Sequence, residues 1–408
     1  MAFGLWTYLY KSSIINLFKF GIIKLGGFEM QQSKVYFTTF KTTGSENLLQ
    51  KLHRLMKTTG FEDIDFKDKF TAIKIHFGEY GNLAFLRPNY AKVVADYVKE
   101  LGGKPFLTDC NTLYVGSRKN AIDHLDTAYV NGFSPLQTGC HVLIADGLKG
   151  TSETLVPIDG EYVKEAKIGQ AIMDADVFIS LTHFKGHEMA GFGGALKNIG
   201  MGSGSRAGKM EQHCDGKPTV NEKDCVGCHS CYKICAHEAP VITDGKATID
   251  HDKCVGCGRC LAVCPKDAIS ASFSDSIKIL NYKMAEYSLA VCKDRPCFHI
   301  SLICDVSPNC DCHAENDIPI IPDVGMLASF DPVALDKACA DLCNQMPPIS
   351  ESILGEHIKN NEKMGKNHND NHKHDHFSMT HPDTEWESCI EHAVKIGLGT
   401  DQYELVRI

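Results

Sequence analysis

Two runs of four cysteines, between Cys225 and Cys264, constrain this chain more than any other feature. The runs read CVGCHSCYKICA and CVGCGRCLAVCP, and both have the spacing C-x2-C-x2-C-x3-C. Three thiolates on one tight loop can ligate three irons of a cubane iron–sulfur cluster, and the fourth cysteine of such a run ligates the neighbouring cluster. The sequence therefore predicts two [4Fe–4S] clusters in this part of the chain.

Each predicted cluster takes three ligands from one run and one from the other. The ligands of the first cluster are Cys225, Cys228, Cys231 and Cys264, and those of the second are Cys254, Cys257, Cys260 and Cys235. Gly227, Gly256 and Gly258 allow the loops to turn and bring backbone N–H groups toward the sulfurs. Disulfides suit secreted chains and zinc sites use two pairs of ligands, so neither alternative matches two runs of four.

The composition is that of a globular protein from a reducing compartment. With 408 residues, 43% apolar and 23% charged, the chain fits about two to three domains. A net charge of -9 without a basic run argues against a nucleic-acid partner. The chain has 19 cysteines, and those left after the cluster ligands would not persist as thiols in an oxidising environment. This indicates a cytoplasmic protein, typical of an anaerobe.

The first 29 residues are apolar but are interrupted by Lys11, Lys19 and Lys24, which leaves them too broken for a membrane span. They also lack the charged start and the cleavage site of a signal peptide. Because the codons of Gly26-Gly27 can form a ribosome-binding sequence, we expect translation to start at Met30 and residues 1–29 to be a translated leader. The whole stretch 1–33 is expected to lie outside the folded domains, as a leader that is not native or is disordered. An amphipathic membrane anchor is the alternative.

From Lys34 onward, apolar segments of strand length alternate with amphipathic segments of helix length. Strands are expected at 34–40, 70–76, 105–109, 141–146, 176–183 and 297–306, with one more ending at Asp323 and a final one at 403–408. Helices are expected at 46–60, 90–103, 118–133, 164–175 and 279–292, after Asp331-Pro332 and from Glu385. This alternation is typical of an α/β fold with a mostly parallel sheet flanked by helices.

The cysteine runs interrupt this pattern as an insertion. We expect residues 34–216 to form the first part of the α/β domain and residues 273–408 the second part. Between them, residues 217–272 are expected to form a small α+β dicluster ferredoxin-like domain, in which each cysteine run leads into a short strand.

Four expected strands end on a residue that can bind metal or move a proton: His76, Asp109, Asp146 and His183. In an open parallel sheet the ligand crevice lies outside the carboxyl ends of the strands. We therefore expect these four side chains to gather at one edge of the sheet, around a crevice. Polar residues satisfied in surface loops are the alternative.

The glycine-rich segment 183–213 is the second feature with functional content. Glycine permits close backbone approach to a ligand, and the helix start after Gly193-Gly194 suits a phosphate or carboxylate. The predicted cofactor-binding residues are Gly193, Gly194 and Lys197. The predicted catalytic residues are His183, His187, Lys197 and His213. A purely structural loop is the alternative.

Two further segments leave metal binding open. Cys310 and Cys312 form a Cys-x-Cys pair followed by His313, which suits either a metal or a tight turn with reduced thiols. Residues 360–381 are polar and rich in histidine. We interpret this stretch as a solvated loop, with nickel or zinc binding as the alternative.

Several segments together resemble the domain-of-unknown-function 362 family: IHFGEYGN, LTDCNTLY, HFKGHEMAGFGGALKNIGMG, CDC and DVGMLASFDPVALDKA. The resemblance runs from about Lys34 to Ile408, apart from the histidine-rich loop. It implies a prokaryotic iron–sulfur protein with a ferredoxin-type module inside an α/β domain. It implies no reaction, because the family has no general assigned activity.

His187 and the run AGFGGALK are also similar to a short part of the lactate racemase family. In that family a lysine covalently carries a nickel-pincer nucleotide, and nearby histidines ligate nickel or exchange the substrate proton. The resemblance implies such roles for Lys197, His187 and His213. GFGGA departs from the usual GFSGG, and the racemases lack iron–sulfur clusters, so the resemblance indicates where a cofactor or anionic substrate lies.

These features lead to one hypothesis and two alternatives. The chain is expected to relay electrons between the two clusters and a crevice of His76, Asp109, His183, His187, Lys197, Cys310 and Cys312. Its redox partner is a protein or a small-molecule substrate. The alternatives are a non-enzymatic electron-transfer or adaptor protein and a racemase-like enzyme, so an additional metal or organic cofactor is left open.

Overall fold

The computed structural model describes residues 21–25, 28–113, 116–213, 217–235, 237–254, 256, 258–271, 277–363 and 375–408. At its centre is a nine-stranded sheet of order β1-β2-β16-β15-β8-β3-β4-β5, and β17 pairs with β2. These strands are β1 (Gly21–Leu25), β2 (Phe28–Thr39), β3 (Phe70–Lys74), β4 (Lys104–Asp109), β5 (His141–Ile144), β8 (Val177–His183), β15 (Cys297–Ile303), β16 (Gly325–Ser329) and β17 (Tyr403–Arg407).

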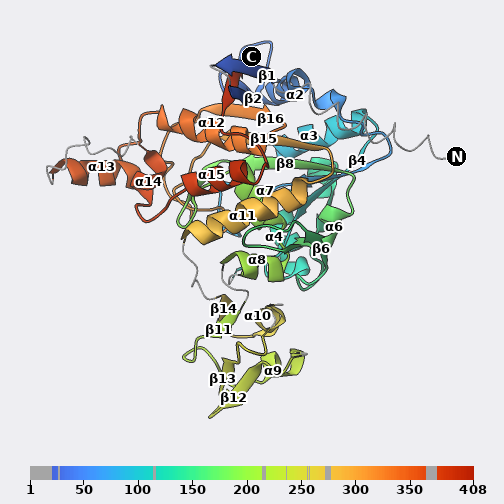
Figure 1. Ribbon diagram of the computed structural model, residues 1–408, viewed down its shortest axis with the longest axis vertical. Helices are drawn as coiled ribbons and strands as arrows, with labels where there is room; N and C mark the ends of the chain where they lie inside the picture. The colour runs from blue at the N-terminus through green and yellow to red at the C-terminus, as the bar shows by residue number, and fades with distance from the viewer. Residues whose placement is uncertain are drawn as a thin grey trace.

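Helices cover both faces of this sheet (Figure 1). They are α2 (Leu48–Thr59), α3 (Pro88–Glu100), α4 (Ala121–Val130), α5 (Pro135–Thr138), α6 (Gln170–Met173), α7 (Ala195–Ser203), α8 (Arg206–His213), α11 (Ile277–Cys292), α12 (Pro332–Asn344), α13 (Ile353–Lys363), α14 (His376–Thr380) and α15 (Glu387–Lys395), with a 3-10 turn at Phe61–Asp63. The predicted α/β fold class is confirmed. In the part of the chain that is described, no helix combines the length and apolarity needed to cross a membrane.

The strands β15-β8-β3-β4-β5 run parallel to one another, whereas β16 pairs antiparallel with both β15 and β2. Strand β8 shows why this part of the sheet is buried on both faces. Val177 and Ile179 pack into the core on one face, and Phe178 packs into the core on the other. A continuous apolar run of this kind is typical of a parallel sheet covered by helices.

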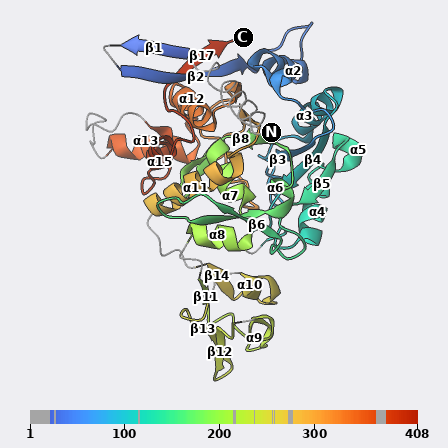
Figure 2. The ribbon, with the colours of Figure 1, turned by 45° about the vertical axis from the view of Figure 1, so that its right-hand side comes forward.

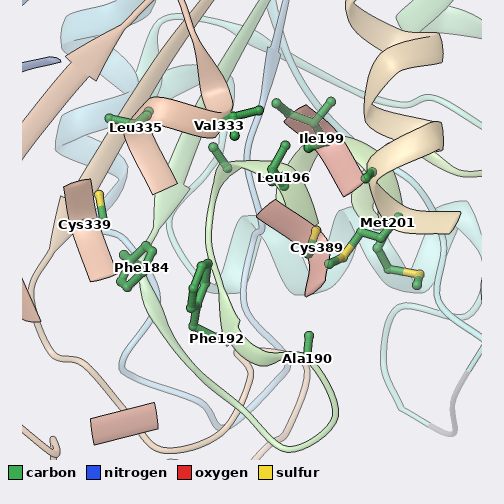
Figure 3. Close-up of a cluster of buried hydrophobic side chains, with 14 of the residues drawn as sticks. Phe184, Ala190, Phe192, Leu196, Ile199, Met201, Val333, Leu335, Cys339 and Cys389 are labelled. Atoms are coloured by element: carbon green, nitrogen blue, oxygen red, sulfur yellow. The ribbon is translucent and has the colours of Figure 1, made fainter. Parts of the chain in front are cut away.

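The buried apolar side chains form two large cores, one on each face of the sheet. Figure 3 shows part of the first core, which α7, α11, α12 and α15 enclose. Phe184 and Phe192 pack there with their ring centroids 4.8 Å apart. Helices α7 and α11 approach so closely that a side chain at Gly200 would collide with the carbonyl oxygen of Met284. The second core lies against α2 and α3 and includes Leu52 and Val94.

Two predicted elements are wrong. Residues 164–175 were expected to be helical, but they form β7 (Glu165–Gly169), which pairs with β6 (Glu153–Pro157), and the short α6. The buried residues Ala166 and Ile168 alternate with more exposed neighbours, which is the period of a strand. The strand expected to end at Asp323 is absent from the described residues there, and β16 begins after it, at Gly325.

The residues expected to form the inserted domain make a small unit that lies beyond α8 in both ribbon views (Figures 1 and 2). It contains the pair β11 (Pro218–Val220) and β14 (Ile269–Ala271), the pair β12 (Pro240–Thr243) and β13 (Lys246–Ile249), and the helices α9 (Ser230–Ile234) and α10 (Arg259–Val263). We call this unit the cysteine module. The boundaries of the module at 217 and 272 stay predictions. The start of translation at Met30 also stays a prediction.

Candidate functional site

The cysteines of the two runs line two separate cavities in the cysteine module. One cavity of about 350 Å³ is lined by Cys225, Cys228, Cys231 and Cys264. A second cavity of about 350 Å³ is lined by Cys235, Cys254 and Cys260, while Cys257 lies outside the described residues. The first cavity thus combines three cysteines of one run with the fourth cysteine of the other, and the second combines the two described cysteines of the second run with the fourth of the first. This is the grouping that the spacing predicts for two cubane clusters.

Backbone amides surround the sulfurs in both cavities. The N–H of Ala247 donates to Cys225 Sγ at 3.3 Å, and that of Ala268 donates to Cys264 Sγ at 3.3 Å. In the second cavity, the N–H of Gly256 lies 3.5 Å from Cys254 Sγ. Thiolates with amide donors in an apolar cavity are the setting in which iron–sulfur clusters are held. The residues present therefore fit such a cluster.

Position 227 requires glycine for two reasons, the backbone conformation there and the lack of space for a side chain. Its φ is 63°, and a side chain there would collide with the carbonyl oxygen of Gly245. Gly227→Ala should therefore destabilise the cysteine module by about 1–3 kcal/mol, measured by proteolysis at rising urea concentration. Gly245→Ala is the matched control, because Gly245 has a φ of 74° and no atom near its missing side chain. Equal effects of the two variants would contradict the clash.

A third cavity, of about 680 Å³, lies where β3, β4 and β8 reach their carboxyl ends, and we call it the crevice. The predicted residues that line it are His76, Asp109, His187, Lys197, His213, Cys310 and Cys312. His183 and Asp146 do not line it. The His183 ring bonds Asp311 at 2.9 Å and the Cys304 carbonyl at 2.8 Å, and Asp146 accepts a bond from Asn111 at 2.8 Å. Two of the four strand-end residues therefore face the crevice.

Backbone contacts hold His187 in one orientation. Its Nδ1 accepts hydrogen bonds from the N–H groups of Met189 and Ala190, both at 3.0 Å. The neutral ring therefore carries its proton on Nε2, which lies 3.8 Å from Glu188. His213, from α8, lines the same cavity. Burial lowers the pKa of His213 to about 3, so its ring is neutral.

The half-buried Lys197 and the buried Cys310 form a charged pair. Lys197 Nζ donates to Cys310 Sγ at 3.0 Å. The pKa of the Cys310 thiol lies well below its usual value, because Cys312 donates a hydrogen bond to it and the Lys197 ammonium lies beside it. Burial opposes the charge on Lys197, but the Cys310 thiolate raises the pKa of Lys197 above its ordinary value. The crevice therefore contains an ammonium–thiolate pair.

The helix start after Gly193-Gly194 was expected to bind the anion of a ligand, but a carboxylate of the protein itself occupies it. The Asp336 carboxylate accepts hydrogen bonds from the N–H groups of Ala195 at 2.6 Å and Leu196 at 2.9 Å. Burial raises the pKa of Asp336 to about 7. These amides are occupied, which corrects the expectation that they hold a ligand. A cofactor role for Gly193, Gly194 and Lys197 stays a prediction.

An ionic group around Asp109 lines the crevice, and its partners Lys74 and Arg118 were not singled out from the sequence. Lys74 Nζ lies 2.9 Å from Asp109 and 2.9 Å from Asn198 Oδ1, and the Arg118 guanidinium lies 3.8 Å from Asp109. Burial alone would raise the pKa of Asp109, but the neighbouring Lys74 ammonium lowers it well below its usual value. The sequence did carry one signal for this group, because Lys74 places a charge inside the mostly apolar stretch FTAIKIH.

Helix α8 lies between the crevice and the cysteine module. Lys209 and His213 face the crevice. Met210 belongs to the apolar cluster that also contains Cys225, and a side chain at Gly258 would lie 2.6 Å from Arg206 Cγ. One short helix therefore contacts both the second cysteine loop and the crevice.

Comparison with known proteins identifies a family and several distant structures. The family model described as "Domain of unknown function (DUF362)" matches residues 71–341. Over 131 residues the chain is 29% identical to the thylakoid-associated protein sll1697 of Synechocystis, a match that covers 32% of this chain and 36% of that relative. The chain thus spans about a third of that relative's length.

Two solved structures are similar at low level. The lactate racemase apoprotein from Thermoanaerobacterium thermosaccharolyticum is 12% identical, with a TM-score of 0.32 over 70% of this chain and 56% of that chain. A protein from Thermotoga maritima is 14% identical, with a TM-score of 0.37 over 73% of this chain and 58% of that chain. Similarities of this size carry no conclusion about activity.

Proposed function

The chain belongs to the family described as domain of unknown function DUF362, and on that premise we propose that it holds two [4Fe–4S] clusters and relays electrons between them and the crevice. The supporting observation is the grouping of the cysteines. Cys264 joins Cys225 around one cavity, and Cys235 joins Cys254 around the other, although each pair comes from different runs. Two independent metal loops would not need this exchange.

The clusters would supply one-electron transfer, and the crevice residues would bind and protonate what receives the electrons. His187 presents the proton on Nε2, and Lys197 holds a proton beside Cys310. Lys209 Nζ donates to the carbonyl oxygens of Gly202 at 3.3 Å and Gly204 at 2.7 Å. Its ammonium leaves positive charge in the crevice, which favours an anionic substrate.

The first test is the metal content and intact mass of protein purified without oxygen. We expect about eight irons per chain, since each cluster holds four, together with an unmodified mass. Iron far below eight after reconstitution would overturn the cluster assignment. The variants Lys197→Met and His187→Gln should then keep all the iron but slow electron transfer from reduced clusters to a small-molecule acceptor at least about tenfold. Unchanged rates would instead favour an electron carrier or adaptor for another protein.

A racemase-like enzyme is the second candidate, because His187, Lys197 and His213 line one cavity. In that case nickel and a mass adduct on Lys197 would accompany the iron. The positive charge on Lys197 disfavours this candidate, because a covalent bond to a cofactor would need the neutral amine. An ammonium paired with the Cys310 thiolate has no free electron pair with which to form a covalent bond.

A further inference from the structure

A group of three metal-binding side chains lies at the edge of the crevice, apart from the cysteine module. One ligand atom each from Glu188, Cys312 and His313 lies within 4.8 Å of the other two. Glu188 and Cys312 line the crevice, while the Glu188 and His313 side chains are each 36% exposed. The group therefore lies where an ion can enter from solvent and still face the cavity.

The donor atoms suit zinc in kind and in spacing. Zinc binds thiolate sulfur at about 2.3 Å and imidazole nitrogen or carboxylate oxygen at about 2.0–2.2 Å, in tetrahedral geometry. Tetrahedral donors at those bond lengths lie about 3.3–3.8 Å apart. His313 Nε2 and Glu188 Oε1 are already 3.1 Å apart. Movements of about 1 Å would bring all three donors to the ion.

The backbone that carries these donors is held from several sides. Asn82 Nδ2 donates to the His313 carbonyl at 3.0 Å, and the N–H of Glu79 donates to the Asp311 carbonyl at 2.9 Å. On the other side, the amides that bind His187 fix the residue next to Glu188. Donors on a supported backbone lose little conformational freedom on binding an ion.

We propose that Glu188, Cys312 and His313 bind a divalent zinc ion at the mouth of the crevice, with the fourth coordination position open to the cavity. The charges balance, because a carboxylate and a thiolate offset the two charges of the ion, and Cys312 releases its proton on binding. The neighbouring Lys197–Cys310 pair is already neutral as a pair. Three protein ligands with an open fourth position are the arrangement of catalytic zinc sites.

The test uses the full chain, with its iron content measured, after incubation with zinc and removal of the excess. We expect one zinc per chain, and X-ray absorption at the zinc edge should show one sulfur at about 2.3 Å with nitrogen and oxygen at about 2.0 Å. Cys312→Ser and His313→Ala should each weaken zinc binding more than about 100-fold, since even supporting residues outside the ligand set contribute about 10–100-fold. Iron should not change.

Cys110→Ser is the matched control, because Cys110 is a crevice thiol that donates to the Ser203 carbonyl at 3.3 Å and lies outside this group. It should bind zinc like the original chain. If the zinc ion had no sulfur ligand, it would be assigned to the histidine-rich stretch 360–381, and the proposal would be overturned. Unchanged zinc affinity in His313→Ala, a half-buried position at the rim of the crevice, would also overturn it, provided that the variant keeps its iron.

Discussion

Cys264→Ser is expected to remove the same four irons as Cys225→Ser, although the two cysteines belong to different runs. Both thiols line the first cavity, so each substitution should lower iron from about eight to about four per chain. The double variant should lose no more iron than either single variant. Iron content and the electron paramagnetic resonance of the reduced protein measure both outcomes.

Cys235→Ser supplies the contrast. Cys235 follows Cys225 in the same run but lines the second cavity. Combining it with Cys225→Ser should therefore remove nearly all iron, whereas ligands grouped by run would leave about half. Cys140→Ser, a buried thiol in the second core, should leave the iron unchanged.

Asp109→Ala is expected to destabilise the α/β domain by about 3–5 kcal/mol. The substitution would leave the Lys74 ammonium, which is 1% exposed, without its carboxylate partner, whereas the Arg118 guanidinium keeps Glu79 at 2.9 Å. Breaking a buried pair costs more than the pair contributes, because the Lys74 ammonium left behind has no opposite charge beside it and no water. Urea unfolding of the variant, followed by far-UV circular dichroism, would measure this cost.

Asp96→Ala is the matched control for this prediction. Asp96 pairs with Lys92 at 2.8 Å, close to the 2.9 Å of the buried pair, but both side chains are more than a third exposed. Its loss should cost less than about 1 kcal/mol. The double variant Lys74→Met/Asp109→Leu should be more stable than either single variant. Similar costs for Asp109→Ala and Asp96→Ala would show that Lys74 carries no buried charge.

Patterns that are local in the sequence predicted much of the architecture. The apolar run of β8 and the proline after Asp331 led to the correct strand and helix start. The segment 164–175 was one of the two exceptions, since its apolar positions satisfy a helical period as well as the two-residue period of β7. Short segments of this kind are decided by tertiary packing.

The partners of the crevice residues could not be predicted, because they come from distant parts of the chain. Asp336 on α12 caps α7, and Asp311 orients His183 across the sheet edge. His183 lies at the end of a strand and was therefore expected to face a ligand. Its ring nitrogens instead form hydrogen bonds within the protein, to Asp311 and to the Cys304 carbonyl. Only the tertiary structure distinguishes His183 from His187, which remains in the cavity.

The pairing of β17 with β2 affects the order in which the protein can fold during synthesis. Tyr403–Arg407 complete the sheet beside the strand that begins at Phe28, and β15 joins β8 only after the cysteine module has been made. Within the module, β12 and β13 pair close in sequence, and β11 pairs with β14 at the other end of the same module. Local contacts form early and distant ones late. On the ribosome, the module can therefore fold while the half-built sheet still exposes apolar strand edges, the kind of surface that makes partly folded chains prone to aggregate.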